Sequence, residues 1–164
     1  MFKIDDHVVY GISGVCRIIE ICHSPFNKAD DRLFYVMQPL FGVGNATIYT
    51  PTDNELQKIR PLVSRAEAEA LFQHPPVIET VKVEFEKKRR DAYHAVMMEN
   101  SPLSYLKILK SVKLRRLETY ENKKHLPDVD VEYEAKAKKC LCGELAVVLD
   151  REYADIESKI REIL

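Results

Sequence analysis

The chain has 164 residues, of which 46% are apolar and 31% charged, so it can bury a core and is not a disordered tail. Its 25 basic residues balance 26 acidic ones, which excludes a uniformly basic nucleic-acid coat. No stretch approaches the roughly 18 uncharged apolar residues of a membrane-spanning helix, so we expect no membrane partner.

The N-terminal residues MFKIDDHVVY contain acids where a signal peptide has its apolar stretch. We therefore expect the protein to remain in the cytoplasm, with its four cysteines as reduced thiols.

The first part of the chain has the composition of a small β-domain. Four of the five glycines lie before residue 45, and glycines of this kind mark tight turns between strands. Short β-branched and aromatic runs lie among them, at residues 7–10, 15–21, 33–37 and 47–49. Residues 24–31 are polar and predict a loop. The pattern predicts a small antiparallel sheet that closes on itself, a β-barrel over residues 1–62 that ends in an irregular stretch.

From residue 63 onward the pattern is helical. Ser64 and Glu67 form a capping-box signature, and the prolines after His74 end that helix. A long helical run is predicted over 80–99, followed by a helix capped by Ser101, one from about residue 128, and a last one from about residue 153. The fold class is therefore α+β: a small β-barrel followed by an all-helical bundle of about five helices over 63–164.

Apolar residues at helical spacing predict which helix faces are buried. The stripes are Leu103, Leu106, Leu109 and Leu117 (interrupted by Lys113), then Ala137, Leu141, Leu145 and Val148, then Tyr153, Ile156, Ile160 and Ile163.

Charge is uneven within the helical part. Residues 82–124 hold twelve basic and six acidic residues, an excess of +6, whereas residues 126–164 have six basic and ten acidic, or −4. The near-neutral total therefore hides a local basic region.

No constellation for catalysis, metal binding or a cofactor is present in the sequence. The Gly42-Val43-Gly44 turn lacks the lysine and hydroxyl residue of a phosphate loop. The five histidines are scattered, and Cys140 and Cys142 are two apart in a predicted helix, so their side chains point to different faces. We expect a protein that is not an enzyme and that uses no metal or cofactor.

The sharpest binding feature is Phe85 followed by four cations, Lys87, Lys88, Arg89 and Arg90. Cations beside an aromatic ring are suited to holding phosphates while the ring meets bases. The alternative is a core phenylalanine beside a solvated charged face, since Phe85 has the helical spacing to share one face with Tyr93.

A second binding feature is the β-rich, uncharged run around Thr47, Ile48 and Tyr49. An exposed strand edge there is a template on which a partner can add a strand. The alternative is a strand paired only within its own barrel.

Three stretches together resemble the CarD/CdnL family of bacterial RNA polymerase-binding regulators. They are Phe2-Lys3-Ile4-x-Asp6-x-Val8-Val9-Tyr10 with Gly14, then Ile48-x-x-Pro51-x-Asp53-Asn54, and then Ala135-Lys136-Ala137-Lys138-Lys139-x-Leu141-x-Gly143-Glu144-Leu145-Ala146. They occur in the order of that family and at compatible spacing over nearly the whole chain.

The resemblance implies a Tudor-like domain that adds its edge strand, here Thr47, Ile48 and Tyr49, to the β-subunit lobe of RNA polymerase. It also implies a helical domain on promoter DNA at the upstream edge of the transcription bubble, where an aromatic wedge at the minor groove, with little sequence specificity, stabilises the open complex. The wedge position corresponds to Phe85, and the phosphate-holding cations to Lys87, Lys88, Arg89 and Arg90.

The chain departs from the family pattern in three places. It has no tryptophan, the usual wedge residue; Ser24 and Tyr49 stand where relatives have arginines; and residues 130–134 are acidic where relatives have extra basic residues. These departures keep open an alternative, a protein–protein adaptor that docks by strand addition without contacting DNA.

Overall fold

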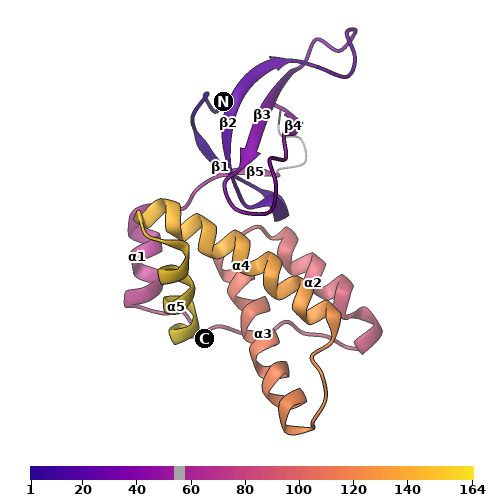
Figure 1. The fold of residues 1–164 in the computed structure, drawn as a ribbon, viewed down its shortest axis with the longest axis vertical. Helices are drawn as coiled ribbons and strands as arrows, with labels where there is room; N and C mark the ends of the chain where they lie inside the picture. Colours follow the sequence, from indigo (N-terminus) through magenta and orange to yellow (C-terminus); the bar gives the residue numbers. More distant parts are fainter. Residues whose placement is uncertain (54–57) are drawn as a thin grey trace. The chain divides into compact units, whose positions relative to one another are not determined.

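The computed structural model describes residues 1–53 and 58–164. The chain divides into two compact units, Met1–Leu62 and Val63–Leu164. We call them the β-unit and the helical unit (Figure 1). Asn54, the last residue of the second stretch quoted above, lies outside the described residues.

The β-unit is one antiparallel sheet with the strand order β4-β3-β2-β1-β5. Its elements are β1 (His7–Tyr10), a 3-10 turn η1 (Gly11–Ser13), β2 (Val15–His23), β3 (Leu33–Pro39), β4 (Ile48–Pro51) and β5 (Ile59–Pro61). Residues 24–32 connect β2 to β3 as the predicted loop. Two differences concern ends of strands: Thr47 precedes β4 rather than belonging to it, and β5 lies in the stretch predicted to be irregular.

One face of this sheet carries a cluster of buried residues that forms a core of the β-unit. Its buried residues are Val8, Cys16, Ile18, Tyr35, Met37 and Ile59, with Phe2, Tyr10, Ile21 and Ile48 packed against them. Tyr35 and Met37 are two residues apart on β3, so they share a face, and Ile48 lies directly opposite Met37. The period-two pattern of the strands thus places Ile48 inward and Tyr49 on the opposite face.

The helical unit contains α1 (Arg65–Gln73), a 3-10 turn η2 (Glu86–Lys88), α2 (Arg89–Met98), α3 (Pro102–Glu121), α4 (Asp128–Leu149) and α5 (Tyr153–Ile163). Helix α4 is central, because it packs against α1, α2, α3 and α5. A five-stranded antiparallel sheet followed by five α-helices confirms the predicted α+β class.

Two of the predicted helix starts are confirmed by their caps. The Ser64 side chain accepts a hydrogen bond from the Glu67 N–H, and the Glu67 carboxylate accepts one from the Ser64 N–H. Ser101 and Ser104 form the same reciprocal arrangement, with Pro102 as the first helical residue.

The predicted helix over 80–99 is wrong in its first half. Residues 80–85 are not helical, and α2 begins only at Arg89 after the 3-10 turn. The reason is visible in the pattern: Val81, Val83 and Phe85 alternate with polar residues, and a period of two favours an extended chain.

The buried face of α3 also differs from the predicted leucine stripe. Leu106 and Leu109 are buried, but Leu103 and Leu117 are exposed, and the core-facing residues include Tyr105, Ile108 and Val112. Leucines occur all round α3, so spacing alone could not choose the face; packing against α2 and α4 did. In α4 and α5 the stripes hold better, with Ala137, Leu141, Leu145, Ile156 and Ile160 all buried.

Among the described residues, no helix has the length and apolar character needed to cross a membrane.

The burial of the cysteines predicts their reactivity. Cys16, Cys140 and Cys142 are buried, whereas Cys22 is partly exposed, and burial raises the pKa of the Cys142 thiol to about 12. Because the thiolate is the reactive form, we expect one fast thiol, Cys22, and three slow ones when the native protein is titrated with Ellman's reagent. A Cys22→Ser variant should lose the fast phase; a fast phase that survives would contradict this assignment of burial.

Candidate functional site

Strand β4 lies at one end of the sheet order, so one of its edges faces β3 and the described residues leave its other edge unpaired. Ile48 lies opposite Met37, Tyr49 opposite Val36, and Thr50 opposite Tyr35. We call the edge of β4 that faces away from β3 the open edge.

The register decides which main-chain groups of β4 are directed toward the open edge. The Thr52 N–H donates to the Leu33 carbonyl over 2.9 Å, which makes Leu33 and Thr52 a hydrogen-bonded pair. Hydrogen-bonded and non-hydrogen-bonded pairs alternate along an antiparallel ladder, so Tyr35 and Thr50 bond to each other and Val36 and Tyr49 do not. The N–H and C=O of Tyr49 therefore point toward the open edge.

The other candidate site surrounds Phe85 in the helical unit. Phe85 has extended backbone angles (φ −135°, ψ 142°) and stands immediately before the 3-10 turn. Its side chain is 56% exposed, so it does not share a buried helical face with Tyr93. The interpretation of Phe85 as a core residue is therefore wrong, because the chain is extended where that interpretation needs a helix.

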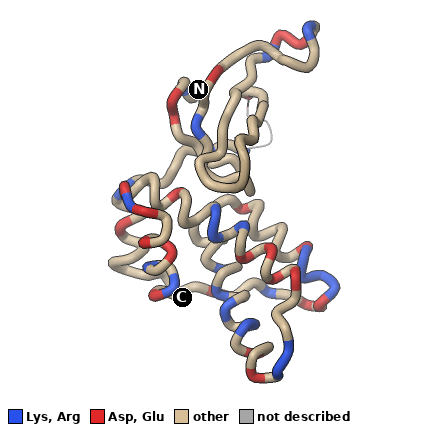
Figure 2. The backbone as a smooth tube through the Cα atoms, in the orientation of Figure 1, with Lys and Arg blue, Asp and Glu red and all other residues tan. Residues whose placement is uncertain are grey.

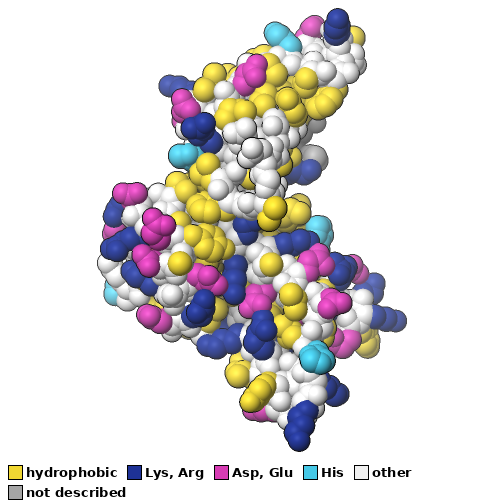
Figure 3. All heavy atoms as spheres, in the orientation of Figure 1, with side chains coloured by type: hydrophobic (Ala, Val, Ile, Leu, Met, Phe, Trp, Pro, Cys, Tyr) yellow, Lys and Arg dark blue, Asp and Glu magenta, His cyan; other side chains and the backbone are white. Residues whose placement is uncertain are grey.

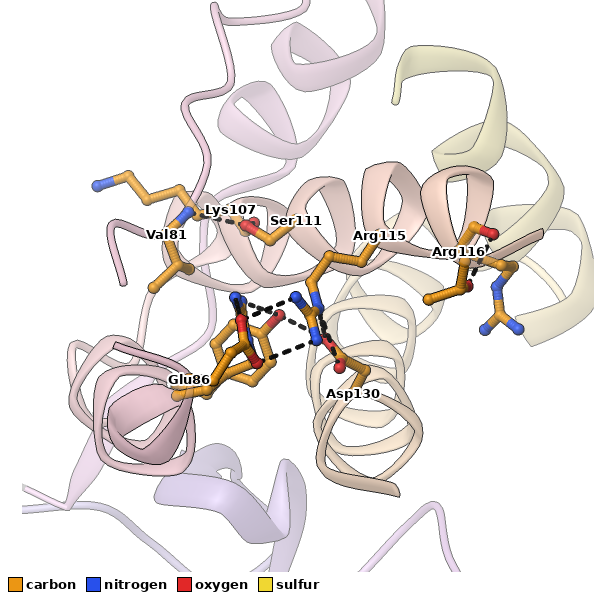
Figure 4. A network of polar contacts seen from close by, with 10 residues as sticks. Val81, Glu86, Lys107, Ser111, Arg115, Arg116 and Asp130 are labelled. Atoms are coloured by element: carbon orange, nitrogen blue, oxygen red, sulfur yellow. Dashed lines mark hydrogen bonds and ion pairs between the residues drawn. The ribbon is translucent and has the colours of Figure 1, made fainter. Parts of the chain in front are cut away.

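The Phe85 segment is tied to α3 on both sides. The Val81 N–H donates to Ser111 Oγ at 2.7 Å, and Ser111 Oγ in turn donates to the Lys107 carbonyl at 2.7 Å. On the other side of Phe85, the Arg115 guanidinium donates to both carboxylate oxygens of Glu86 (Figure 4). Ser111 and Arg115 are four residues apart, about one helical turn, so Phe85 lies between two anchors on one face of α3.

Glu86 belongs to a closed circuit of side chains that we call the Asp130 ring: Glu86, Arg89, Tyr93, Asp130 and Arg115. Arg115 Nε donates to both oxygens of Asp130, at 3.0 and 3.1 Å, and the Tyr93 hydroxyl donates to Asp130 at 2.7 Å. Arg89 donates to the Tyr93 hydroxyl at 3.3 Å and to Glu86 at 2.6 Å, which closes the ring.

The Asp130 ring links four elements. Glu86 comes from η2, Arg89 and Tyr93 from α2, Arg115 from α3 and Asp130 from the first turn of α4. Asp130 is completely buried, and a buried carboxylate needs such charged and hydroxyl donors to offset its lost hydration. The ring thus fixes the start of α2 and the residue after Phe85 at the same time.

Two pKa shifts follow from this geometry. Hydrogen bonding from the Arg89 guanidinium, with a further contribution from Arg115, lowers the pKa of the Glu86 carboxyl. Desolvation, with the hydrogen bond to Asp130, raises the pKa of Tyr93 to about 12, so its hydroxyl remains a donor at neutral pH.

The four cations after Phe85 are not equivalent. Arg89 is buried within the Asp130 ring, and Arg90 pairs with Glu132 at 2.7 Å. Lys88 makes only a long 3.8 Å pair with Asp91, and the side chain of Lys87 makes no hydrogen bond or ion pair with any described residue. The cations available to an external anion next to Phe85 are therefore Lys87 and Lys88.

The carboxylates of the acidic run 130–134 form ion pairs with basic side chains of the helical unit. Asp130 pairs with Arg115, Glu132 with Arg90 and Lys136, and Glu134 with Arg116 and Lys138. Basic and acidic segments alternate over the helical unit (Figure 2). Much of the basic excess of residues 82–124 is thus balanced by the first turns of α4.

The sequence patterns did not predict the Asp130 ring. Its members lie up to 44 positions apart, and Asp130 stood in an acidic run interpreted only as a departure from the family pattern. The one local signal was the i, i+3 spacing of Glu86 and Arg89, which fits an ion pair on one helical turn.

Among the described residues, no group of three or more histidine, cysteine, aspartate or glutamate side chains is placed to hold a metal ion.

The family model described as the CarD-like/TRCF RID domain matches residues 2–63. The β-unit is therefore a CarD-like/TRCF RID domain. Domains of this family interact with the β subunit of RNA polymerase, so the CarD-like unit makes this a transcription-associated protein. The match ends where the helical unit begins, and a comparison with curated proteins found no match.

The Asp130 ring predicts a large difference between two neighbouring acids in this CarD-like protein. Replacing Asp130 by alanine leaves Arg115 and the Tyr93 hydroxyl without their buried partner, so Asp130→Ala should lower the free energy of unfolding by about 3–5 kcal/mol. Glu132 lies two residues away but makes surface pairs, so the matched control Glu132→Ala should cost only about 0–1 kcal/mol. Urea denaturation followed by circular dichroism measures both, and equal losses would contradict a structural role for the ring.

Proposed function

We propose that this protein is a non-enzymatic transcription regulator that docks on the β subunit of RNA polymerase through β4 and contacts promoter DNA through Phe85, Lys87 and Lys88. In this proposal the helical unit binds at the upstream edge of the transcription bubble and stabilises the open complex.

The match of residues 2–63 to a polymerase-interacting domain family is the observation that carries the proposal. The open edge of β4 supports strand addition as the way of docking. Its pairing groups at Tyr49 belong to the main chain, so the serine and tyrosine that replace family arginines at positions 24 and 49 leave the hydrogen bonds of an added strand intact.

The DNA contact is supported by the position of Phe85. A half-exposed aromatic ring between two anchors on α3 is preorganised, so little conformational entropy is lost when it meets a base. Lys87 and Lys88 lie two and three residues after Phe85 and are available to phosphates. Phenylalanine supplies an apolar plane but no indole N–H, so stacking is available to it whereas a hydrogen bond to a base edge is not.

The proposed mechanism combines docking on the polymerase with an aromatic contact that is made only with opened DNA. Docking on the polymerase raises the local concentration of the helical unit at the promoter to about the millimolar range, so weak DNA binding suffices. A contact made only with opened DNA shifts the closed–open equilibrium by its differential free energy, about tenfold for 1.4 kcal/mol. One stacked aromatic contributes about 1–3 kcal/mol per base, which is enough for that shift.

The proposal predicts distinct effects for Phe85 and for the lysines. Phe85→Ala should weaken binding to a forked promoter fragment about tenfold while leaving binding to the matching duplex nearly unchanged, because only the fork offers an unstacked base. Replacing Lys87 and Lys88 by alanine should weaken both and reduce the slope of log K against log salt by about 2. Fluorescence anisotropy of labelled DNA measures these affinities with the whole chain.

A matched control truncates another exposed apolar side chain of the same unit, Val77→Ala, which should change neither affinity. The chain has no tryptophan, so Phe85→Trp also provides a single fluorophore whose emission should shift on binding forked DNA. Retention of fork preference by Phe85→Ala would refute the wedge. Equally poor binding of forked DNA by the wild type and the lysine variant at low salt would favour the adaptor alternative, which the internal pairing of Arg89 and Arg90 also supports.

A further inference from the structure

An exposed aromatic group lies beside β4 in the β-unit. Phe26, from the loop between β2 and β3, is 74% exposed. Its ring stands edge-on to Tyr49 on β4, with centroids 5.4 Å apart, and to Phe34 on β3, at 6.5 Å. We call Phe26, Phe34 and Tyr49 the aromatic patch. In the space-filling view, hydrophobic side chains gather on the β-unit near the loop between β2 and β3 (Figure 3).

The aromatic patch lies on the face of the sheet opposite the cluster that contains Tyr35 and Met37. Tyr49 is directly across from Val36, and Phe34 is two residues from Val36, so these side chains share a face that Tyr35 and Met37 do not. Phe34 is buried and has the Phe26 ring edge-on to it, while Tyr49 keeps 40% of its surface exposed. The two outer rings are therefore available to a partner.

The charged side chains beside the patch pair with one another within the β-unit. The Arg32 guanidinium lies 5.8 Å from the centre of the Phe34 ring, and it forms a two-bonded ion pair with Asp30 at 2.9–3.2 Å and a 3.8 Å pair with Asp53. An arginine held by two carboxylates offers little to a charged partner. The chemistry of this surface is aromatic.

The main-chain geometry of the open edge indicates that a partner binds there as an added β-strand. Because the N–H and C=O of Tyr49 point toward the open edge, an added strand forms a hydrogen-bonded pair with Tyr49 itself. In any such pair the two side chains lie on the same face, with Cβ atoms about 5 Å apart. The partner residue opposite Tyr49 thus comes to lie beside Tyr49 and within reach of Phe26.

We propose that the aromatic patch receives a large apolar side chain of the strand that adds to β4, at the position opposite Tyr49. The inference rests on the proposed docking on the RNA polymerase β subunit and specifies the chemistry of that contact. Relatives have an arginine at position 49, which would make ionic contacts. In this protein Tyr49 provides aromatic packing at that position, so docking depends on the burial of apolar surface rather than on charge.

The test measures binding of the whole chain to the core RNA polymerase of the same bacterium by biolayer interferometry. Phe26→Ala should raise the Kd about tenfold, the loss expected when a packed aromatic anchor of an interface is truncated. Val43→Ala, which truncates a fully exposed apolar residue of the same unit, should leave the Kd unchanged. The Kd of the wild type should change less than about threefold between about 50 and 500 mM salt, because the proposed contact is between apolar side chains and the Arg32 guanidinium beside it is already paired within the β-unit. Phe26 is too exposed for its loss to unfold the unit, and circular dichroism verifies this.

Tyr49→Pro separates this inference from the docking proposal. Tyr49→Ala removes only the ring, whereas proline also removes the N–H that faces the open edge, which an edge strand tolerates, and so should abolish strand addition. If Tyr49→Pro breaks binding while Tyr49→Ala and Phe26→Ala do not, the aromatic patch is refuted while docking at β4 stands. If none of these variants weakens binding, docking at β4 is refuted as well. Loss with Phe26→Ala alone would overturn the inference, because the patch would then bind without the strand register that defines it.

Discussion

The helical unit depends on how one buried carboxylate is satisfied. Asp130 is completely enclosed in the first turn of α4, and it draws Arg115 from α3 and Tyr93 from α2 toward it. Since those two groups also reach Arg89 and Glu86, the same ring fixes where α2 starts and where the preceding extended segment ends. Phe85 is exposed at a defined place because the residue next to it is held by this ring.

Arginines and lysines have different roles in the helical unit. Arginines, which can donate to two carboxylates at once, occupy the internal pairs: Arg89 and Arg115 in the Asp130 ring, Arg90 and Arg116 against α4. Lysines remain at the surface around Phe85. The local excess of basic residues therefore overstates the positive charge that is available to a polyanion. Whether each cation is an arginine or a lysine predicts its availability better than the total charge does.

The two units carry recognition features of different kinds. In the β-unit the feature is main-chain geometry, the register that turns the Tyr49 N–H and C=O to the open edge, with aromatic rings beside it. In the helical unit it is a single ring with neighbouring lysines, and its availability depends on buried polar contacts. A strand edge tolerates changes of side chain, whereas a positioned aromatic ring does not, so departures from the family pattern weigh more heavily on the helical unit.

The α+β class, the family of the β-unit and two capped helix starts followed from the sequence, because these depend on local periodicity, turn residues and capping spacings that act within a few residues. The exposure of Phe85 did not follow, since it depends on an extended segment that Ser111 and Arg115 anchor from about 30 positions away. Nor did the roles of Arg89 and Asp130, which look like surface charges until distant helices enclose them. The register of β4 and the approach of Phe26 to Tyr49 are likewise long-range pairings, which only the folded sheet brings together.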